Sequence, residues 1–453
     1  QRKRVKILRN KICYNYHILK RWYVIMNRKQ RRELRKDKNL IIELYSIITK
    51  YLPQLFDKFK SLTDVRHQSY VTYDMKVICV TRLFGLICGI TSLSPISSDE
   101  FNTEDCIKNI SAICNTTLTE LPYWETIQDV FINIKIDELR EIQKYIIKTL
   151  IRSKMFDKYR FEGSFQLLFD GTGLSNHSYN LNNNCLKRKH KDGKISYYKY
   201  VLECKLVVGN IVISLDSEFI ENENMLTDKQ KQDCETNAFK RMIKRIKKNY
   251  PKYKFIITGD ALYATTPIIN ICKKYKWNYI FNLKPDRLKE INEMFEDNIN
   301  YENETSHKNY FLSTNIKYKN NSINAFKHIE TKNKKTTIFR YISNLNINDY
   351  NIKDIVALGR KRWKIENEGF YTQKHRTFNI SHLNSRNDNS MKCHYFFIQF
   401  AHTIRQLLEQ GNLLTKSLNL KIKEVSSFLL KTLTSTIPNL NILENNFQLR
   451  FDT

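Results

Sequence analysis

The sequence predicts an α/β protein built on a mixed β-sheet, preceded by an all-helical domain and followed by C-terminal helices. Two observations support this fold class. From about residue 39 to 150 the apolar residues recur at helical spacing, whereas from residue 165 onward short apolar runs bounded by turn residues alternate with helical segments. With 453 residues, the chain is long enough for two or three domains.

The first domain is expected at residues 39–155, where three segments carry the helical pattern: LIIELYSIITKYL, VICVTRLFGLICGI and ELREIQKYIIKTLI. The most apolar run, residues 77–93, has two glycines at the GxxxG spacing that pairs helices in membranes. It is only 17 residues long and contains Arg82, so a buried core helix is expected there instead. The sequence therefore predicts no membrane partner.

The charge balance indicates a polyanionic partner. The chain has 76 Lys and Arg against 46 Asp and Glu, which gives a net charge of +30. A field of that sign concentrates nucleic acid first and anionic membrane second. Coding DNA rich in A and T favours Lys codons and accounts for part of the Lys content. It favours Asn codons as well, however, and does not by itself explain so large a positive charge. The hydrophobic content of 41% argues against global disorder.

Residues 1–38 form a basic N-terminal arm with interleaved Tyr and Trp. Such an arm either binds nucleic acid, with cations on phosphates and rings on bases, or is a solvated basic helix that packs its aromatic side chains on the body. Both interpretations are open at this point. No apolar signal segment follows the arm, and the ten cysteines include no CxxC pair. We therefore expect reduced thiols, no structural zinc and a cytoplasmic location, on DNA.

The sheet is expected to begin with a strand and a hairpin. FQLLFD (165–170) is a short apolar run that ends in an acid. YVLECKLVV (200–208) and IVISLDSEFI (211–220) flank Gly209-Asn210, a two-residue turn, and are typical of an antiparallel hairpin. A charged helix is expected after them, at about 229–248.

Helices and strands then alternate. KFIITGD (254–260) and NYIFNLK (278–284) are expected strands, with a helix after Pro267 between them. This order resembles the ribonuclease H-like arrangement, a mixed sheet with helices on its faces, and predicts a catalytic domain at 160–410. The later elements are an inserted β-module at about 286–350, one helix over 352–375, two helices within about 391–432, and a C-terminal helical tail at 411–453.

Two of the expected strands end in aspartate beside glycine, at Asp170-Gly171 and Gly259-Asp260. In α/β sheets, ligands bind beyond the carboxyl ends of the strands, and glycine lets the backbone approach a ligand closely. Either aspartate alone would more often be a helix cap or a turn former. The pair, in this strand order, favours a shared site.

A third acid is available on the helix after the β-module. Glu366 and Glu368 face about 200° apart on an α-helix, so only one of them can join the two aspartates. Arg362 precedes Glu366 by four residues and Phe370 follows it by four, which places the three on one stripe. We therefore select Glu366 as the third catalytic acid.

Three segments now carry a resemblance to a known family. LLFDGTGLSNHS, GDALYATTP and RKRWKIENEGFYTQK resemble the insertion-sequence DDE transposases that have a β-strand insertion before the glutamate, and the likeness extends over about residues 40–410. It implies that Asp170, Asp260 and Glu366 form the catalytic and metal-binding triad, with Arg362 as the arginine of the Arg-x3-Glu element. The family's tyrosine position falls at Gly359, and its lysine position falls at Gln373, beside Lys374 but about 100° round an α-helix.

The resemblance also implies cofactors and partners. Two Mg²⁺ ions, or Mn²⁺, suit three carboxylates because hard cations take oxygen ligands. The implied partner is double-stranded DNA, as terminal inverted repeats and as target, bound by a homodimer. Alternative functions are a ribonuclease H-like nuclease without strand transfer, and a decayed or domesticated element that only binds DNA.

Basic residues near the triad are candidates for DNA binding, and a solvated basic face is their alternative interpretation. Trp363 is expected to be a core residue. The segment 185–194 is either a basic hairpin tip over DNA or an exposed loop. The candidate DNA-binding residues are Arg360, Lys361, Arg362, Lys374, Arg376, Lys187, Arg188 and Lys189.

Overall fold

The computed structural model describes residues 40–182, 184–222, 232–293, 309–411, 421–435 and 448–451. Contacts divide the chain into two compact units, residues 1–155 with 375–379 and 384–453, and residues 156–374 with 380–383. The basic arm at 1–38 lies outside the described residues. The sequence-based boundaries at 155 and 410 stay predictions, although the contacts group the helix at 388–410 with the N-terminal helices.

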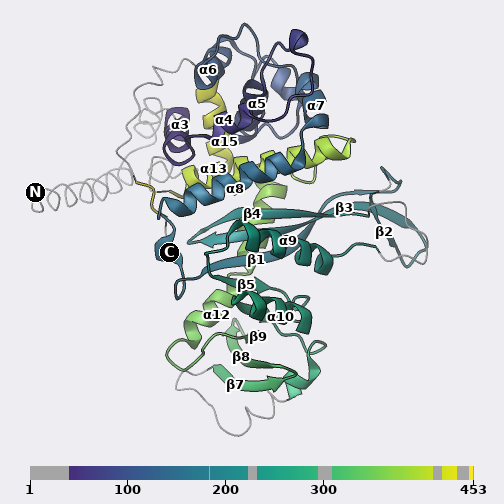
Figure 1. The fold of residues 1–453 in the computed structure, drawn as a ribbon, viewed down its shortest axis with the longest axis vertical. Coiled ribbons are helices and arrows are strands. Elements are labelled where there is room, and N and C mark those ends of the chain that lie inside the picture. Colours follow the sequence, from purple (N-terminus) through teal and green to yellow (C-terminus); the bar gives the residue numbers. More distant parts are fainter. Residues whose placement is uncertain are drawn as a thin grey trace, which may run out of the picture. The chain divides into compact units, whose positions relative to one another are not determined.

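The first unit is helical, as the spacing of apolar residues predicts. Its long helix α13 packs against α3, α5, α7 and α8 (Figure 1). Nearly every residue of α5 is buried, which confirms the expected core helix. The helices are α3 (Leu40–Tyr51), α4 (Leu55–Lys60), α5 (Met75–Ile87), α6 (Glu104–Cys114), α7 (Trp124–Asn133), α8 (Ile136–Arg152), α13 (Asp388–Gln410) and α15 (Ile422–Leu433).

The arginine inside this apolar helix is accommodated by backbone carbonyls. Arg82 is fully buried and donates to the carbonyl oxygens of Ile90, Thr91 and Ser92 at 2.9–3.2 Å. Its charge thereby compensates carbonyl groups of the segment that follows α5. Within the described part of the chain, no helix is both long and apolar enough to cross a membrane.

The second unit is a mixed α/β structure, and its described residues form a nine-stranded sheet. The hairpin β3–β4 turns at Gly209, whose φ of 56° is the left-handed conformation that glycine adopts without strain. The sheet order is β2-β3-β1-β5-β6-β9-β8-β7, with β4 also paired to β3. The strands are β1 (Phe165–His177), β2 (Leu186–Lys189), β3 (Ile195–Val208), β4 (Ile211–Ile220), β5 (Phe255–Gly259), β6 (Asn278–Asn282), β7 (Tyr310–Tyr318), β8 (Asn321–Lys332) and β9 (Lys335–Ser343).

Strand β1 is longer than the apolar run predicts. It continues past Asp170 to His177 because β3 pairs with it antiparallel as far as that residue. On its other side, β1 pairs with β5 in parallel only from Phe165 to Leu168. Asp170 is therefore inside a strand rather than at its tip, but it still lies just beyond the end of the parallel ladder.

Helices cover both faces of this sheet. Successive residues of β1 point to opposite faces. Phe169 contacts Phe239 of α9 (Glu235–Asn249) on one face, with ring centroids 4.9 Å apart. On the other face, Gln166 donates to the carbonyl oxygen of Leu358 in α12 (Ile352–Arg360) at 2.7 Å. Asp170 shares the second face because it lies an even number of residues from Gln166.

The long helix expected over 352–375 is interrupted. The α-helical winding of α12 ends at Arg360, and Ile365–Arg376 winds as a π-helix, in which each residue bonds to the one five positions away. Ile365 and Phe370, five residues apart, both pack into an apolar cluster with Leu168. In an α-helix this pair would point about 140° apart, so the wider winding lets both side chains reach the sheet.

The strands between β6 and α12 extend the same sheet. β9 pairs with β6, and β8 and β7 follow it in antiparallel order. β8 and β9 are joined by a two-residue turn at Asn333-Lys334. Within the second unit, α10 (Thr266–Tyr275) contacts β6, and an apolar cluster joins β5, β6, β8 and β9 to α12. The description of these strands as an inserted module stays a prediction.

Candidate active site

The register of two parallel strands aligns the two aspartates. Leu168 of β1 is level with Thr258 of β5, and each aspartate comes two residues later. Asp170 and Asp260 therefore occupy equivalent positions just past the point where the two strands stop pairing. Each carboxylate also accepts a local backbone bond: Gly171 N–H donates to Asp170 at 3.0 Å, and Leu262 N–H donates to Asp260 at 2.8 Å.

An arginine joins the first aspartate to the glutamate. Arg362 Nη1 lies 2.7 Å from Glu366 Oε1 and 3.8 Å from Asp170 Oδ2. Glu366 is the first acid of the π-helix, while Glu368 pairs with Lys364 at 3.3 Å. The expected stripe is thus half correct: Arg362 contacts Glu366, but Phe370 is buried with Ile365 in the apolar cluster.

The negative charges of the site outnumber the positive charges that contact them. Burial raises the pKa of Asp170, the Arg362 guanidinium lowers it, and the charges of Glu366, Glu235 and Asp260 raise it again, to about 7. The carboxylates are therefore close enough to repel one another in a partly desolvated environment. Such a cluster is a site where an added cation is favourable.

The donor set suits a hard divalent cation. The clustered side chains are carboxylates and tyrosine hydroxyls, all oxygen donors of the kind that Mg²⁺ and Mn²⁺ prefer. Among the residues that the structure describes, however, no three His, Cys, Asp or Glu side chains are arranged closely enough to hold a metal ion. Arg362 instead supplies the positive charge between Asp170 and Glu366.

A fourth carboxylate, absent from the sequence-based site, lies in the same cluster. Glu235 is the first residue of α9, and it accepts hydrogen bonds from Tyr200 Oη at 3.1 Å and Tyr263 Oη at 3.4 Å. Burial raises its pKa, and the charge of Asp260 adds to this effect. Nothing in the local sequence distinguishes Glu235 from the other charged residues around it, because only the packing of α9 brings it to the ends of β1 and β5.

The two glycines beside the aspartates have a different role from the expected one. A Cβ on Gly171 would lie 2.6 Å from Glu235 Oε1, and a Cβ on Gly259 would lie 2.5 Å from the Tyr263 ring. Both glycines therefore make room for side chains of the protein itself. A ligand need not be invoked to explain them.

The candidate DNA-binding residues near the triad differ in their surroundings. Arg360 pairs with Glu330 at 3.1 Å and lies over the Phe339 ring. Burial lowers the pKa of both Lys361 and Lys374, and for Lys374 the charge of Asp170 acts in the opposite direction. Lys374 is thus the lysine beside the cluster, whereas Gln373 is fully buried. Arg376 ends the π-helix and is exposed.

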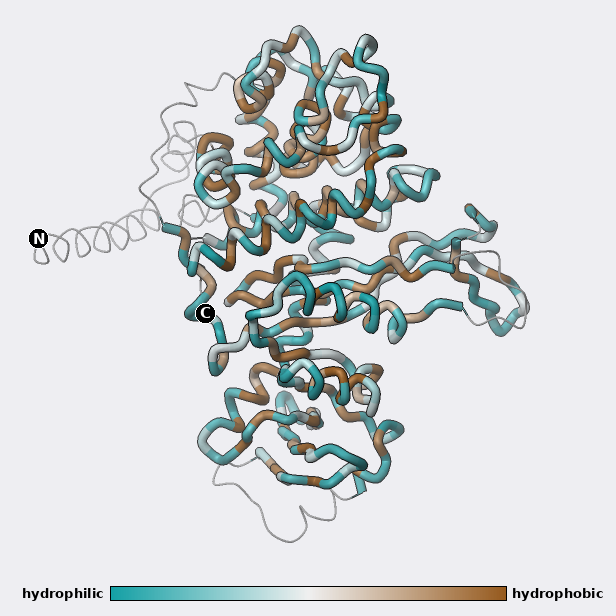
Figure 2. The backbone as a smooth tube through the Cα atoms, viewed as in Figure 1, coloured by the Kyte–Doolittle hydropathy of each residue, from teal (hydrophilic) through white to brown (hydrophobic). Residues whose placement is uncertain are grey.

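The second basic group lies on β2, an edge strand of the sheet. Arg188 and Lys189 of β2 are exposed, Lys187 is half-buried, and the segment 185–194 forms a hairpin with the start of β3. Hydrophilic residues dominate the end of this hairpin (Figure 2). Trp363, expected in the core, is 51% exposed, so the core interpretation was wrong.

Comparison with known families agrees with this arrangement. The sequence profile of the transposase DDE domain matches residues 166–404, more than half of the chain, and includes all three acids of the expected triad. A search of the curated proteins gives no significant match. The extent of the profile match, on a mixed sheet that aligns Asp170 with Asp260, shows that the chain belongs to the transposase DDE domain family.

Proposed function

We propose that the chain is a DNA transposase that binds element ends, cleaves a DNA strand and joins the freed 3′ end to target DNA. The observation that carries the proposal is the alignment of Asp170 with Asp260, together with the Arg362 bridge from Asp170 to Glu366. These three acids come from segments far apart in the chain, and a structural role alone would not require like charges to gather.

Asp170, Asp260 and Glu366 would hold two divalent cations. When bound, such ions activate the attacking oxygen and stabilise the leaving oxygen of a phosphodiester. The protein's own contribution is to hold the carboxylates on a rigid strand, a strand end and a helix, so that little rearrangement is needed on binding.

The neighbouring cations fit the binding of phosphate. On this proposal Arg362 exchanges part of its pairing with Asp170 and Glu366 for a DNA phosphate once metal ions neutralise the acids. Lys374, already in the field of Asp170, is placed to hold a second phosphate. Arg360, Lys361 and Arg376, with Lys187, Arg188 and Lys189 on β2, would contact the DNA backbone, on which the protein acts as a homodimer.

The test compares three single variants with the wild-type chain. Asp170→Asn, Asp260→Asn and Glu366→Gln should each reduce Mg²⁺-dependent cleavage and joining of an end-bearing duplex by about a thousandfold or more, because metal ions supply several kcal/mol of transition-state stabilisation. Binding of the same duplex, measured by fluorescence anisotropy in Ca²⁺, should change by less than about threefold.

A matched control is Glu368→Gln, which removes one acid from the same π-helix and should retain activity. Retained cleavage in any of the three triad variants would refute the assignment. Cleavage without joined products in the wild type would instead indicate a nuclease, and duplex binding without metal-dependent nicking would indicate a protein that only binds DNA.

A further inference from the structure

Glu235 occupies a position that its hydrogen bonds alone do not explain. It reaches the ends of β1 and β5 from the α9 face of the sheet, whereas Asp170 points to the opposite face. It nevertheless lies close to the chain beside Asp170, because a Cβ on the next residue, Gly171, would be 2.6 Å from Glu235 Oε1. Glu235 also accepts a hydrogen bond from Tyr263, whose N–H donates to the carbonyl oxygen of Asp260 at 3.1 Å, so it lies beside the chain just past the last β1–β5 pair at Leu168.

The position of this carboxylate is built by several side chains. The hydroxyl groups of Tyr200 and Tyr263 each donate a hydrogen bond to a different carboxylate oxygen of Glu235. Tyr263 is buried and packs on Phe169 and Phe239, with ring centroids 6.3 and 5.2 Å away. The absence of a Cβ at Gly171 and Gly259 leaves the space that the carboxylate and the Tyr263 ring fill.

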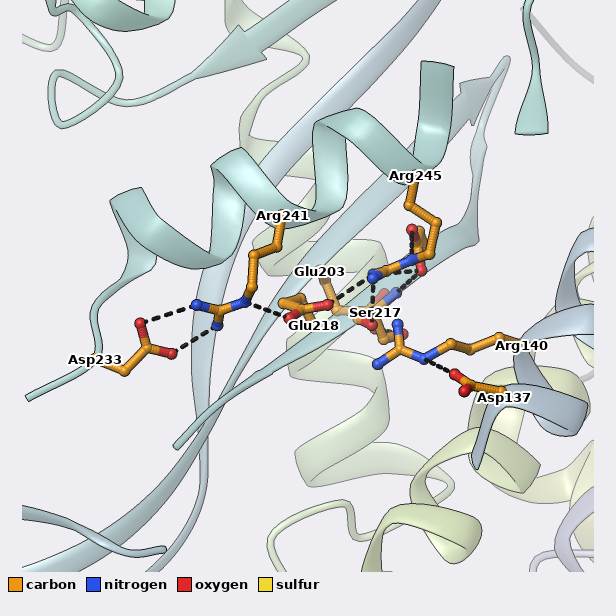
Figure 3. A network of polar contacts seen from close by, with 9 residues as sticks. Asp137, Arg140, Glu203, Ser217, Glu218, Asp233, Arg241 and Arg245 are labelled. Carbon is orange, nitrogen blue, oxygen red and sulfur yellow. Dashed lines mark hydrogen bonds and ion pairs between the residues drawn. The ribbon is translucent and has the colours of Figure 1, made fainter. Parts of the chain in front are cut away.

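The charge of this carboxylate is left without a cation. Among the described residues, its hydrogen-bond partners are two neutral phenols, and no ion pair joins it to Lys or Arg. The acids beside the same helix on β4 are treated differently, because Arg241 and Arg245 of α9 pair with Glu218 and Asp216 (Figure 3). An oriented but unbalanced carboxylate next to two aspartates is suited to attract an external cation.

We propose that Glu235 is a fourth acid of the divalent-cation site, held by Tyr200 and Tyr263, and that it lends its charge to the ions bound by Asp170 and Asp260. The inference rests on the proposed function. Because Mg²⁺ usually keeps several water ligands, a carboxylate that approaches from the other face of the sheet can act on the ion through such a water.

The decisive variant is Glu235→Gln, which keeps the size of the side chain and an oxygen that accepts a hydrogen bond. Mn²⁺ is titrated into the full chain, and free Mn²⁺ is measured by electron paramagnetic resonance. Loss of one nearby negative charge should raise the Mn²⁺ dissociation constant by about tenfold. Tyr200→Phe, which removes only an orienting bond, should raise it by about twofold.

The matched control is Asp233→Asn. Asp233 precedes Glu235 by two residues, but it is balanced by Arg241 at 2.6 Å, so its removal should leave the Mn²⁺ dissociation constant within about twofold of the wild-type value. Thermal unfolding of the metal-free chain distinguishes the loss of a repulsive charge from the loss of a structural contact. Glu235→Gln should unfold at the wild-type temperature or above, because it relieves repulsion, whereas a merely structural residue would lower that temperature.

A further variant separates the two proposals. If Asp170→Asn weakens Mn²⁺ binding and Glu235→Gln does not, the role of Glu235 is refuted while the triad stands. If Asp170→Asn leaves Mn²⁺ binding unchanged, the cation site of the proposed function fails. Equal weakening by Glu235→Gln and Asp233→Asn would also overturn the inference, since it would reduce the effect to net charge.

Discussion

Two groups of acids flank helix α9, and the protein balances them differently. On β4, Asp216 pairs with Arg245 at 2.7 Å and Glu218 pairs with Arg241 at 2.7 Å, while Asp233 takes a second contact from Arg241 (Figure 3). At the ends of β1 and β5, Arg362 contacts Asp170 and Glu366, whereas among the described residues no ion pair joins Asp260 or Glu235 to Lys or Arg.

The difference indicates which acids hold the fold and which are available for chemistry. Removal of a buried acid's partner leaves an unpaired charge, so acids that are each paired with an arginine, such as those on β4, are expected to be structural. A cluster with surplus negative charge is destabilising unless something else supplies the cation. We therefore expect substitutions in the β4 group to change the stability of the fold, and substitutions in the strand-end group to change the binding of metal.

The largest effect on stability is expected from Arg245→Ala. This variant leaves Asp216 and Glu218, whose side chains are only 7% and 11% exposed, without their shared partner. The free energy of unfolding in urea should fall by about 3 kcal/mol. Asp170→Asn, measured in the same way without metal, should leave it unchanged or raise it, and a comparable loss in both variants would remove the distinction between the two groups.

A smaller effect is expected from pH. Since the pKa of Asp170 is raised from 3.8 to about 7 in the folded chain, the folded state binds this proton more tightly than the unfolded state. The group's contribution to stability is therefore favourable at low pH and is lost as pH rises from about 4 to about 7.

For the metal-free protein, the free energy of unfolding should fall across this window on account of Asp170. Asp170→Asn should flatten that part of the profile, and so should saturating Mg²⁺. A pH profile that Asp170→Asn leaves unaltered would contradict the assignment of the surplus charge to this cluster.

The smallest effect concerns two arginines. Arg188 on β2 is exposed and lies over the Tyr198 ring, whereas Arg241 is held by Asp233 and Glu218. If only unpaired cations contact DNA phosphates, Arg188→Ala should lower the slope of log K against log salt by about one. Arg241→Ala should leave that slope unchanged, and the reverse result would show that the α9 network is part of the DNA surface.

Much of the fold could be predicted from the sequence, because its elements have strong local patterns. The helical region, the β3–β4 hairpin and the strands at 165–170 and 254–260 were expected from periodicity and turn residues, and the structure has them, although β1 continues past Asp170 to His177. The helix over 352–375 was expected as a single α-helix, and this was wrong. The pair Ile365 and Phe370 has a spacing of five, which becomes meaningful only when both residues pack on the sheet.

The sequence by itself determined the surplus of positive charge, the order of strands and helices, and the identities of Asp170, Asp260 and Glu366 as candidate acids. Only the tertiary structure decided that Asp170 and Asp260 are level, that Lys374 rather than Gln373 is next to them, and that Glu235 joins them. The physical reason is that periodicity reports which face of an element is buried, whereas strand register and helix packing depend on contacts between distant residues.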